Sequence, residues 1–342
     1  MRRIPQRLLI FIVVFCLPTF GQAQDGAYKK SQYYRGITFS HVVTSVIEDD
    51  VDGDGSKEVL VCYKEQGDSV NQPGGILILS NSAQGYIVAW HALFENVYPK
   101  SVVVSGGSLT FELVQTTMQA DKTISKVFVK GKDFFFRDDE KGPYAGVKIE
   151  ASSTLRSDTV STANIFDRDL ETSWAEGMEG TGVDETVTFE FPKPVNLGLI
   201  GVLHGNYKGR RFWNDNNRIH RAEVTVETSS DRYDTESDVD FEADLGLGLY
   251  GDKIELNFSN KPVMRYFKLG KKSVLSLELK ITSVLLGEKN DDTHIAEIDF
   301  AEMIPSSVIF GTAKPSKKDK PQKPIENKKE EEPDDWTDDD GF

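Results

Sequence analysis

The stretch "ANIFDRDLETSWAEGMEGTGVDETVTFEF", residues 163–191, holds the pattern that decides the fold. Its first part crowds acidic side chains and glycines around Trp174, as in a Gly-rich surface loop. Its end, "TVTFEF", alternates strictly and puts Val187, Phe189 and Phe191 on one face. Alternation with a period of two predicts a half-buried β-strand. The stretch therefore predicts an acidic loop that leads into a strand.

Similar alternating runs recur along the chain. The segments "AEVTVE", "KIELNF", "LELKITSVLL" and "IAEIDF" behave alike and are separated by Gly, Asn and Asp turn clusters. No amphipathic helical stretch of convincing length accompanies them. We therefore expect an all-β chain of the sandwich or barrel type.

The two ends of the chain have different compositions from the part between them. Three arginines precede the apolar run Leu8 to Phe20, and a Gly-Gln-Ala exit follows, which predicts a secretory signal peptide at residues 1–23. The run is too short for a spanning helix. We expect an exported protein, periplasmic or extracellular, without a transmembrane segment in the mature chain. Residues 312–342 are rich in Lys, Pro, Glu and Asp, which predicts a disordered charged tail.

Charge and cysteine content restrict the partners. The formal net charge is −15, and no basic stripe is present that could neutralise phosphates, so we expect no nucleic-acid partner. After signal cleavage only Cys62 remains, within the apolar run "EVLVCY", so it should pack as a small hydrophobe. The acidic end of the tail, with Trp336 and Phe342, is either a solvated tail or a docking site for a protein partner.

The segment "RDDEKGPYAG", residues 137–146, divides two strand-rich regions. We place a smaller β-rich domain at residues 25–143 and a second domain at residues 144–305. The role of the first domain is left open.

The first domain contains an acidic loop, "DDVDGDGSKEVLV", at residues 49–61. Closely spaced carboxylates on a turning backbone supply the oxygens that Ca²⁺ requires. The spacing resembles the calcium loop of FG-GAP repeats, although one copy cannot close a propeller. The alternative is an acidic turn without metal. The resemblance implies a structural Ca²⁺ held by Asp50, Asp52, Asp54 and Glu58.

Three motifs carry a second resemblance. "ANIFDRDLETSW" is similar to the first metal loop of galactose-binding-like, discoidin or factor 5/8 type C domains. Its continuation "AEGMEGTGVDE", together with "HGNYKGRRFWNDNNRIHRAEV" and "VLLGEKNDDTHIAEIDF", resembles the NADase-type glycan-binding domain. The resemblance covers residues 147–303 and implies a jelly-roll β-sandwich.

The resemblance also implies ligands. In the wider fold a calcium ion joins the first metal loop to the closing strand. By position, the ligands here would be Asp167, Asp169, Thr172 and Glu297. Arg168 stands where the fold usually has Gly, so the alternative is that Arg168 pairs with a carboxylate and replaces the ion.

Sugar recognition combines an aromatic face with amide and guanidinium groups. One loop offers this mixture, and we expect its edge to present a glycan-binding rim formed by Tyr207, Trp213, Asn214, Asn217 and Arg218. Trp174 is expected either in the core or at a ligand.

We therefore expect a non-catalytic, lectin-like carbohydrate-binding protein. The alternatives are an envelope scaffold or adhesin, which would bind protein through the sandwich rim or the acidic tail, and, less favoured, a glycan-acting hydrolase with paired carboxylates. The chain lacks a G-x-S-x-G turn, an H-E-x-x-H helix and a phosphate-binding Gly loop. Glu176, Glu179 and Glu185 lie in a Gly-rich loop, where little would perturb a pKa.

Overall fold

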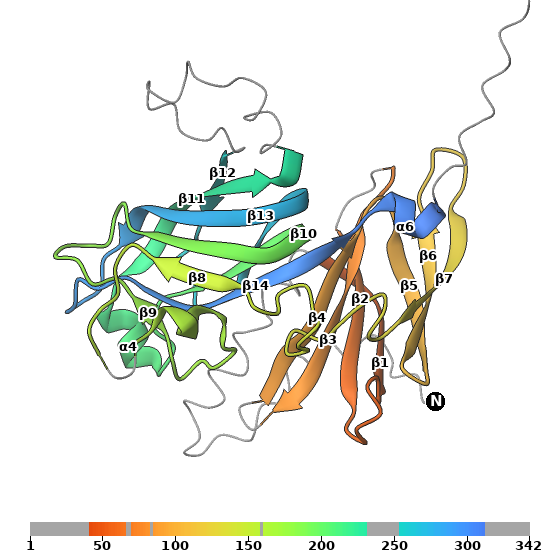
Figure 1. Cartoon of the computed structure of the whole chain (residues 1–342), viewed down its shortest axis with the longest axis horizontal. Helices are drawn as coiled ribbons and strands as arrows, with labels where there is room; N and C mark the ends of the chain where they lie inside the picture. Colours follow the sequence, from red (N-terminus) through yellow and green to blue (C-terminus); the bar gives the residue numbers. More distant parts are fainter. Residues whose placement is uncertain (1–40, 66–69, 83–84, 158–159, 231–252, 312–342) are drawn as a thin grey trace, which may run out of the picture.

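The computed structural model describes residues 41–65, 70–82, 85–157, 160–230 and 253–311. Strands dominate this part of the chain, and the helices are short (Figure 1), so the predicted all-β fold class is confirmed. The predicted signal peptide at 1–23 and the predicted charged tail at 312–342 lie outside the described residues. Within those residues, no helix has the length and apolar character needed to cross a membrane.

The first part of the structure consists of seven strands in two sheets. Strands β1 to β4 form an antiparallel meander, and β5 to β7 form a separate three-stranded sheet. Their bounds are β1 His41–Asp49, β2 Glu58–Glu65, β3 Gly74–Ser82, β4 Gly85–Phe94, β5 Tyr98–Ser105, β6 Ser108–Gln115 and β7 Lys122–Val129. The two sheets enclose one apolar core, in which Cys62 is a free, fully buried thiol as expected.

The second part is a β-sandwich with two long strands, β10 and β13, at its centre. The elements are β8 Lys148–Ala151, η1 Thr162–Phe166, β9 Trp174–Ala175, β10 Thr186–His204, α4 Arg210–Asp215, β11 Arg218–Thr228, β12 Lys253–Asn257, β13 Arg265–Leu285, β14 His294–Ile304 and α6 Ser306–Phe310. Register shifts between β10 and β13, after Glu190 and again before Leu199, interrupt the pairing of these strands.

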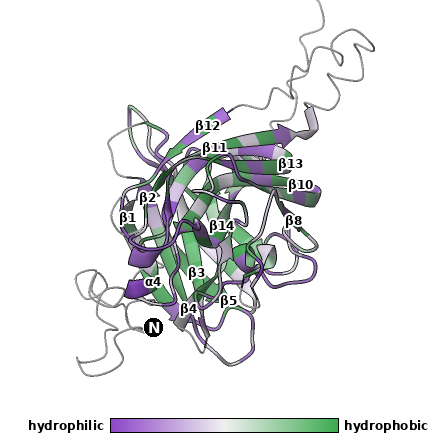
Figure 2. Ribbon diagram, turned by 90° about the vertical axis from the view of Figure 1, so that its left-hand side faces the viewer, coloured by the Kyte–Doolittle hydropathy of each residue, from purple (hydrophilic) through white to green (hydrophobic). Residues whose placement is uncertain are grey.

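Alternation places the core as the sequence predicts. Val187 and Phe189 of β10 are fully buried, whereas Glu190 is exposed. Figure 2 shows the corresponding change between apolar and polar residues along β10 and β13. The predicted strand "AEVTVE" likewise buries Ala222 and Val224 as part of β11.

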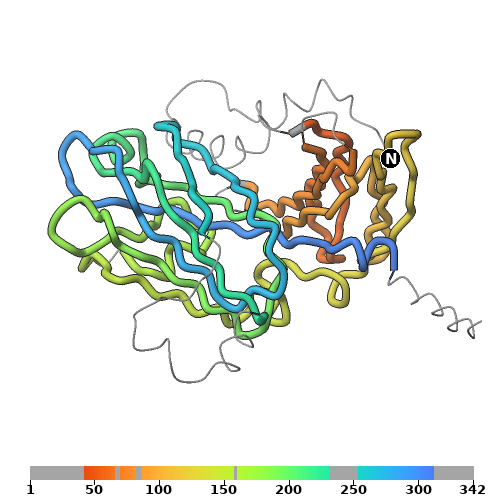
Figure 3. Tube along the Cα trace, turned by 90° about the horizontal axis from the view of Figure 1, so that it is seen from above, coloured from red at the N-terminus to blue at the C-terminus, as the bar shows by residue number. Residues whose placement is uncertain are grey.

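Strand β14 connects the two parts. It pairs antiparallel with β10 and, at its end, in parallel with β4, where Glu302 lies opposite Ala92 and Met303 opposite Leu93. Figure 3 shows this strand running from one part of the molecule to the other. One eleven-stranded sheet therefore spans both parts. Ile309 of α6, directly after β14, is buried in the core of the first part.

Candidate functional site

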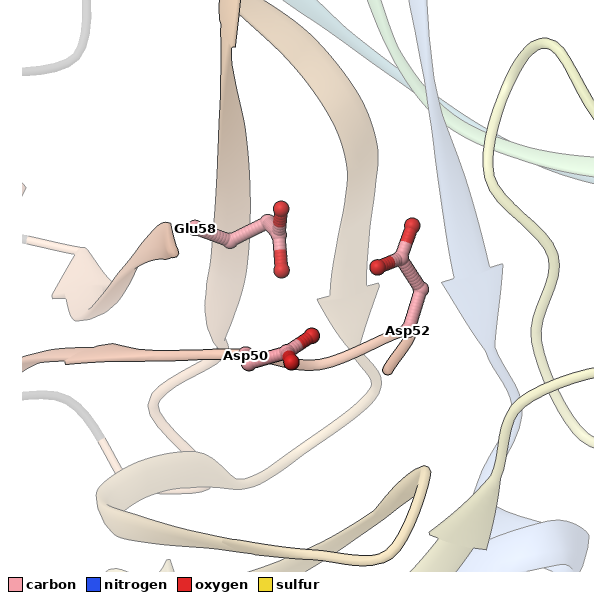
Figure 4. A group of neighbouring side chains, drawn as sticks. All are labelled: Asp50, Asp52 and Glu58. Carbon is pink, nitrogen blue, oxygen red and sulfur yellow. The ribbon is translucent and has the colours of Figure 1, made fainter. Parts of the chain in front are cut away.

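The acidic loop between β1 and β2 gathers three carboxylates. One oxygen each from Asp50, Asp52 and Glu58 lies within 4.8 Å of the others, and Figure 4 shows the three side chains turned toward a common space. Asp54 does not belong to this group, and its carboxylate accepts from the backbone N–H of Ser56 at 2.6 Å. Three of the four residues named from the sequence are therefore brought together.

The backbone of the same loop is shaped by its glycines and by Asp50. Gly53 and Gly55 have φ values of 82° and 90°, which favour glycine, and their N–H groups donate to the two oxygens of Asp50 at 2.7 and 3.1 Å. Burial raises the pKa of Glu58, as do the charges of the neighbouring aspartates. Hard oxygen donors and concentrated negative charge are the chemistry that suits Ca²⁺.

The second acidic loop, after η1, satisfies its own side chains. The two oxygens of Asp167 accept from the backbone N–H of Asp169 at 2.8 Å and from the hydroxyl of Thr172 at 2.7 Å. Asp169 accepts in turn from the N–H of Glu171 at 2.8 Å. Each predicted ligand of this loop is thus engaged in turn formation.

Glu297, the predicted ligand from the closing strand, lies against this loop but is held by arginines. Its Oε1 accepts from Nη2 of Arg137 at 2.7 Å, and its Oε2 accepts from the backbone N–H of Arg168 at 2.7 Å. Burial raises the pKa of Glu297 to about 8, against the opposing effect of the Arg137 charge. Such a desolvated carboxylate requires a cation to remain ionised.

The residues at this second loop do not fit a calcium ion. Among the described residues, only the group at the first loop brings three acidic ligand atoms together, and Asp167, Asp169 and Glu297 form no such group. The positive charge next to Glu297 is the guanidinium of Arg137. The guanidinium of Arg168 lies 3.6 Å from the carboxylate of Asp138 instead. The calcium set of Asp167, Asp169, Thr172 and Glu297 is therefore not assembled in the structure.

The predicted glycan rim must also be corrected. Tyr207 is 0% exposed and Trp213 is 6% exposed, so the expectation that both rings face solvent is wrong. The two rings lie edge to face, 5.3 Å apart, in an apolar cluster with Leu203 and Met264. Neither ring is placed to stack on a sugar, because core packing occupies both.

The remaining rim residues have distinct roles. Asn217 is fully buried, and its side chain accepts from the N–H of Gly287 at 2.7 Å. Arg218 is 7% exposed and donates to the carbonyls of Trp213 at 2.6 Å and Leu286 at 3.2 Å. The side chains of Asn217 and Arg218 therefore form hydrogen bonds to the backbone of neighbouring loops. Asn214 is only half-buried, and its amide is the one predicted rim group of this kind at the surface.

Polar residues of the three sequence motifs connect three loops at one end of the sandwich. The fully buried Glu176 accepts from the backbone N–H groups of Met178 at 3.0 Å and Thr293 at 3.4 Å. The hydroxyl of Thr293 donates to the carbonyl of Thr181 at 2.7 Å. Asn217 pairs with Thr293 in an isolated parallel bridge. The loops at 176–183, 205–217 and 286–293 are therefore held as one surface, which we call the loop end.

Trp174 resolves the alternative that the sequence left open for it. The ring is 0% exposed, and its indole N–H donates to the carbonyl of Ser153 at 3.0 Å. Trp174 is therefore a core residue of the sandwich.

Comparison with known proteins identifies the second part. Residues 143–301 match the family model described as the NAD glycohydrolase translocation F5/8 type C domain. We refer to this part of the chain as the F5/8 type C domain. Its fold is galactose-binding-like, as the sequence resemblance implies. No curated protein matches the chain.

Solved structures similar to part of this chain include two small domains and one larger enzyme. The module CBM32-1 of a family 31 glycoside hydrolase from Clostridium perfringens is 11% identical, with a TM-score of 0.33, over 46% of this chain and 94% of the module. An F5/8 type C domain from Bacteroides fragilis is 14% identical, with a TM-score of 0.32, over 47% and 95%. A mycobacterial arabinofuranosyltransferase is 15% identical, with a TM-score of 0.32, and the match spans 46% of this chain and only 11% of the transferase.

The loop end of the F5/8 type C domain exposes apolar side chains that sequence reasoning missed. Each of its three loops carries at least one, with exposed fractions of 60% for Met178, 42% for Val183, 47% for Phe212 and 66% for Leu286. Phe212 was overlooked because it directly precedes Trp213 in "RRFWND". No pattern within this six-residue helix identifies Phe212 as the exposed ring, although the structure also exposes Arg210 and Arg211 before it.

Helix α4 also carries paired charged groups. The ammonium of Lys289 lies 3.1 Å from the carboxylate of Asp215, and Nε of Arg211 lies 3.3 Å from it. Lys289, followed by Arg211, holds the pKa of Asp215 below its ordinary value. An exposed aromatic ring on a surface that also carries amide and charged groups is a combination that suits sugar recognition.

Proposed function

We propose that this protein is an exported, non-catalytic carbohydrate-binding protein, and that it binds glycan at the loop end of its F5/8 type C domain. The observation that carries the proposal is the half-exposed ring of Phe212 on a helix whose neighbours are locked in place. A rigid exposed ring loses little conformational entropy on binding the apolar face of a sugar.

Polar groups of the same loop end supply the polar half of this interaction. Asn214 offers a half-buried amide, and Arg211 and Lys289 offer donors beside the ionised Asp215. The loop end is held by hydrogen bonds that Glu176 accepts and Arg218 donates, so it is organised before the ligand arrives. The family match supports the same assignment. The apolar run near the N-terminus supports export.

We further propose that the loop between β1 and β2 binds one structural Ca²⁺ through Asp50, Asp52 and Glu58. The converging carboxylates and the burial of Glu58 support this role. The ion would stabilise the first part of the chain and take no part in glycan binding.

A paired substitution tests glycan binding. Phe212→Ala removes the proposed stacking ring, and Phe310→Ala on α6 is a matched control, because that ring is exposed to a similar extent, 42% against 47%. The full mature chain and both variants would be applied to an array of galactose-, N-acetylhexosamine-, fucose- and uronic-acid-terminated glycans. We expect binding to at least one class, reduced roughly tenfold by Phe212→Ala and unchanged by Phe310→Ala. No binding to any glycan, or equal loss in both variants, would overturn the proposal.

A further inference from the structure

Arg137 comes from outside the residues that match the F5/8 type C model, yet it lies inside that domain. It follows the first part of the chain, where its backbone N–H donates to the carbonyl of Ala89 on β4 at 2.7 Å. Its side chain is only 5% exposed and stacks over the ring of Phe166, at 3.6 Å from the ring centroid. The guanidinium of Arg137 is therefore a desolvated cation that lies against Phe166, directly before the second acidic loop.

The guanidinium is surrounded by oxygens from that loop and from β14. Its Nη2 donates to Oε1 of Glu297 at 2.7 Å and to the carbonyls of Phe166 at 3.2 Å and Ile298 at 3.1 Å. Its Nη1 lies 3.4 Å from Oδ1 of Asp299. Two carboxylates and two backbone carbonyls are the kind of oxygen set that a divalent cation would take. Here the planar guanidinium of Arg137, with its fixed set of N–H donors, binds these oxygens.

Arg168, which belongs to this loop, contacts Glu297 through its backbone and not through its side chain. It adopts a φ of 63°, rare for a residue other than glycine, and this turns its backbone N–H onto Glu297. Its own guanidinium is directed to Asp138 and to the carbonyl of Val88. Both oxygens of Glu297 thus have donors, one from each arginine, and only Arg137 contributes its charge.

We infer that Arg137 takes the place of a calcium ion in this F5/8 type C domain, so that the second acidic loop is closed onto β14 by a side chain supplied from the first part of the protein. Two consequences follow. The loop at 167–172 and Glu297 bind no calcium, and the first part of the chain is required for the stability of the domain that it precedes.

The first experiment measures calcium binding with Arg137 intact. Asp50→Asn and Asp52→Asn together disable the first acidic loop, which leaves the second as the remaining candidate site. We expect the melting temperature of this full-length double variant to be the same in EDTA and in millimolar CaCl₂, and titration calorimetry to show no binding. A calcium-dependent rise in melting temperature, or one bound ion per chain, would overturn the inference. This arm does not depend on whether an Arg137 variant folds.

The second experiment replaces the cation in that same background. Arg137→Ala should lower the melting temperature by roughly 10 °C, because it leaves buried carboxylates unpaired. Arg137→Lys should recover only part of the loss, since one ammonium cannot reproduce the fork. Arg168→Ala is the matched control and should have a much smaller effect, because it keeps the backbone N–H. Equal losses in Arg137→Ala and Arg168→Ala would contradict the assignment.

Chemical rescue separates a missing cation from general damage to the core. Millimolar methylguanidinium should raise the melting temperature of Arg137→Ala and leave that of the parent unchanged. Failure of this rescue in a folded Arg137→Ala variant would show that packing and not charge is lost. None of these readouts involves a glycan, so their outcome is independent of the proposed carbohydrate binding.

Discussion

The imidazole of His204 lies edge-on to the indole of Trp213, with 5.3 Å between the ring centroids. Gly205, the next residue, has a φ of 94°, and a Cβ there would come within 2.5 Å of the Trp213 ring. Tyr207 packs against the same ring from another side. Trp213 is thus the centre of a buried aromatic cluster that fixes α4 to the end of β10.

This packing predicts that Trp213→Ala weakens the fold. Loss of a buried tryptophan leaves a cavity, and we expect the free energy of unfolding to fall by about 3–5 kcal/mol. Phe212→Ala, one residue away, should change it by less than about 0.5 kcal/mol, because surface substitutions cost little. Urea denaturation of both variants checks the difference. A similar midpoint for the two would contradict the assigned orientation of α4.

Two buried histidines each lower the stability of the fold in mild acid, whatever the other titrating groups contribute. Burial lowers the pKa of both His204 and His294 to about 4. In the unfolded chain they titrate near pH 6.5, so between pH 6.5 and 4 protons bind the unfolded state preferentially. Their contribution to the free energy of unfolding is therefore complete above pH 6.5. As the pH falls toward 4, each histidine loses about 3 kcal/mol of this contribution.

The measurement is the urea midpoint as a function of pH for the parent and for His204→Gln. Between pH 6.5 and 4 the stability of the variant should rise relative to that of the parent, whatever its stability at neutral pH, because one of the two buried histidines is absent. An identical pH dependence in the two proteins would show that His204 is not held neutral by the fold.

The fold was predictable where information was local. Val187 and Phe189 occupy alternate positions of one strand, so their burial follows from the pattern of "TVTFEF" alone. The orientation of α4 was not predictable in this way. The helix has six residues, too few for its apolar pattern to define one face, and so the sequence did not distinguish the buried Trp213 from the exposed Phe212.

The interactions of the second acidic loop required three-dimensional information. The sequence correctly placed Glu297 close to this loop, because a related arrangement was implied by the family resemblance. It gave no indication of Arg137, which is 160 positions away from Glu297 along the chain. In "FFFRDDEKGPYAG" this arginine reads as one charge among several at a domain boundary. Only the folded contact between β4 and β14 brings it to the carboxylate.

At the loop end, the loop at 286–293 packs so closely on the loop at 205–217 that Gly287 should not tolerate a larger side chain. A Cβ on Gly287 would lie 2.5 Å from the carbonyl oxygen of Asp215 and from the carbonyl carbon of Asn216, both of them backbone atoms. Backbone cannot move aside cheaply, so Gly287→Ala should lower the free energy of unfolding by about 2 kcal/mol or more. Gly131→Ala is a useful comparison, because a Cβ there meets nothing within 4 Å, although its φ of 79° adds some strain. Thermal denaturation of both variants would measure the difference, and an equal loss would show that the loops can separate at Gly287.

The first acidic loop predicts stabilisation by calcium. If Asp50, Asp52 and Glu58 bind the ion in the folded state only, Ca²⁺ at a hundred times its dissociation constant should add about 2.7 kcal/mol to the free energy of unfolding. Asp52→Asn should abolish this gain. Asp121→Asn is the matched control, because Asp121 is an exposed acid outside the group. Since burial and the neighbouring carboxylates raise the pKa of Glu58, protons compete with the ion, and the calcium effect should weaken as the pH falls. Melting curves in EDTA, CaCl₂ and MgCl₂ test this set, and a response that survives Asp52→Asn would place the ion elsewhere.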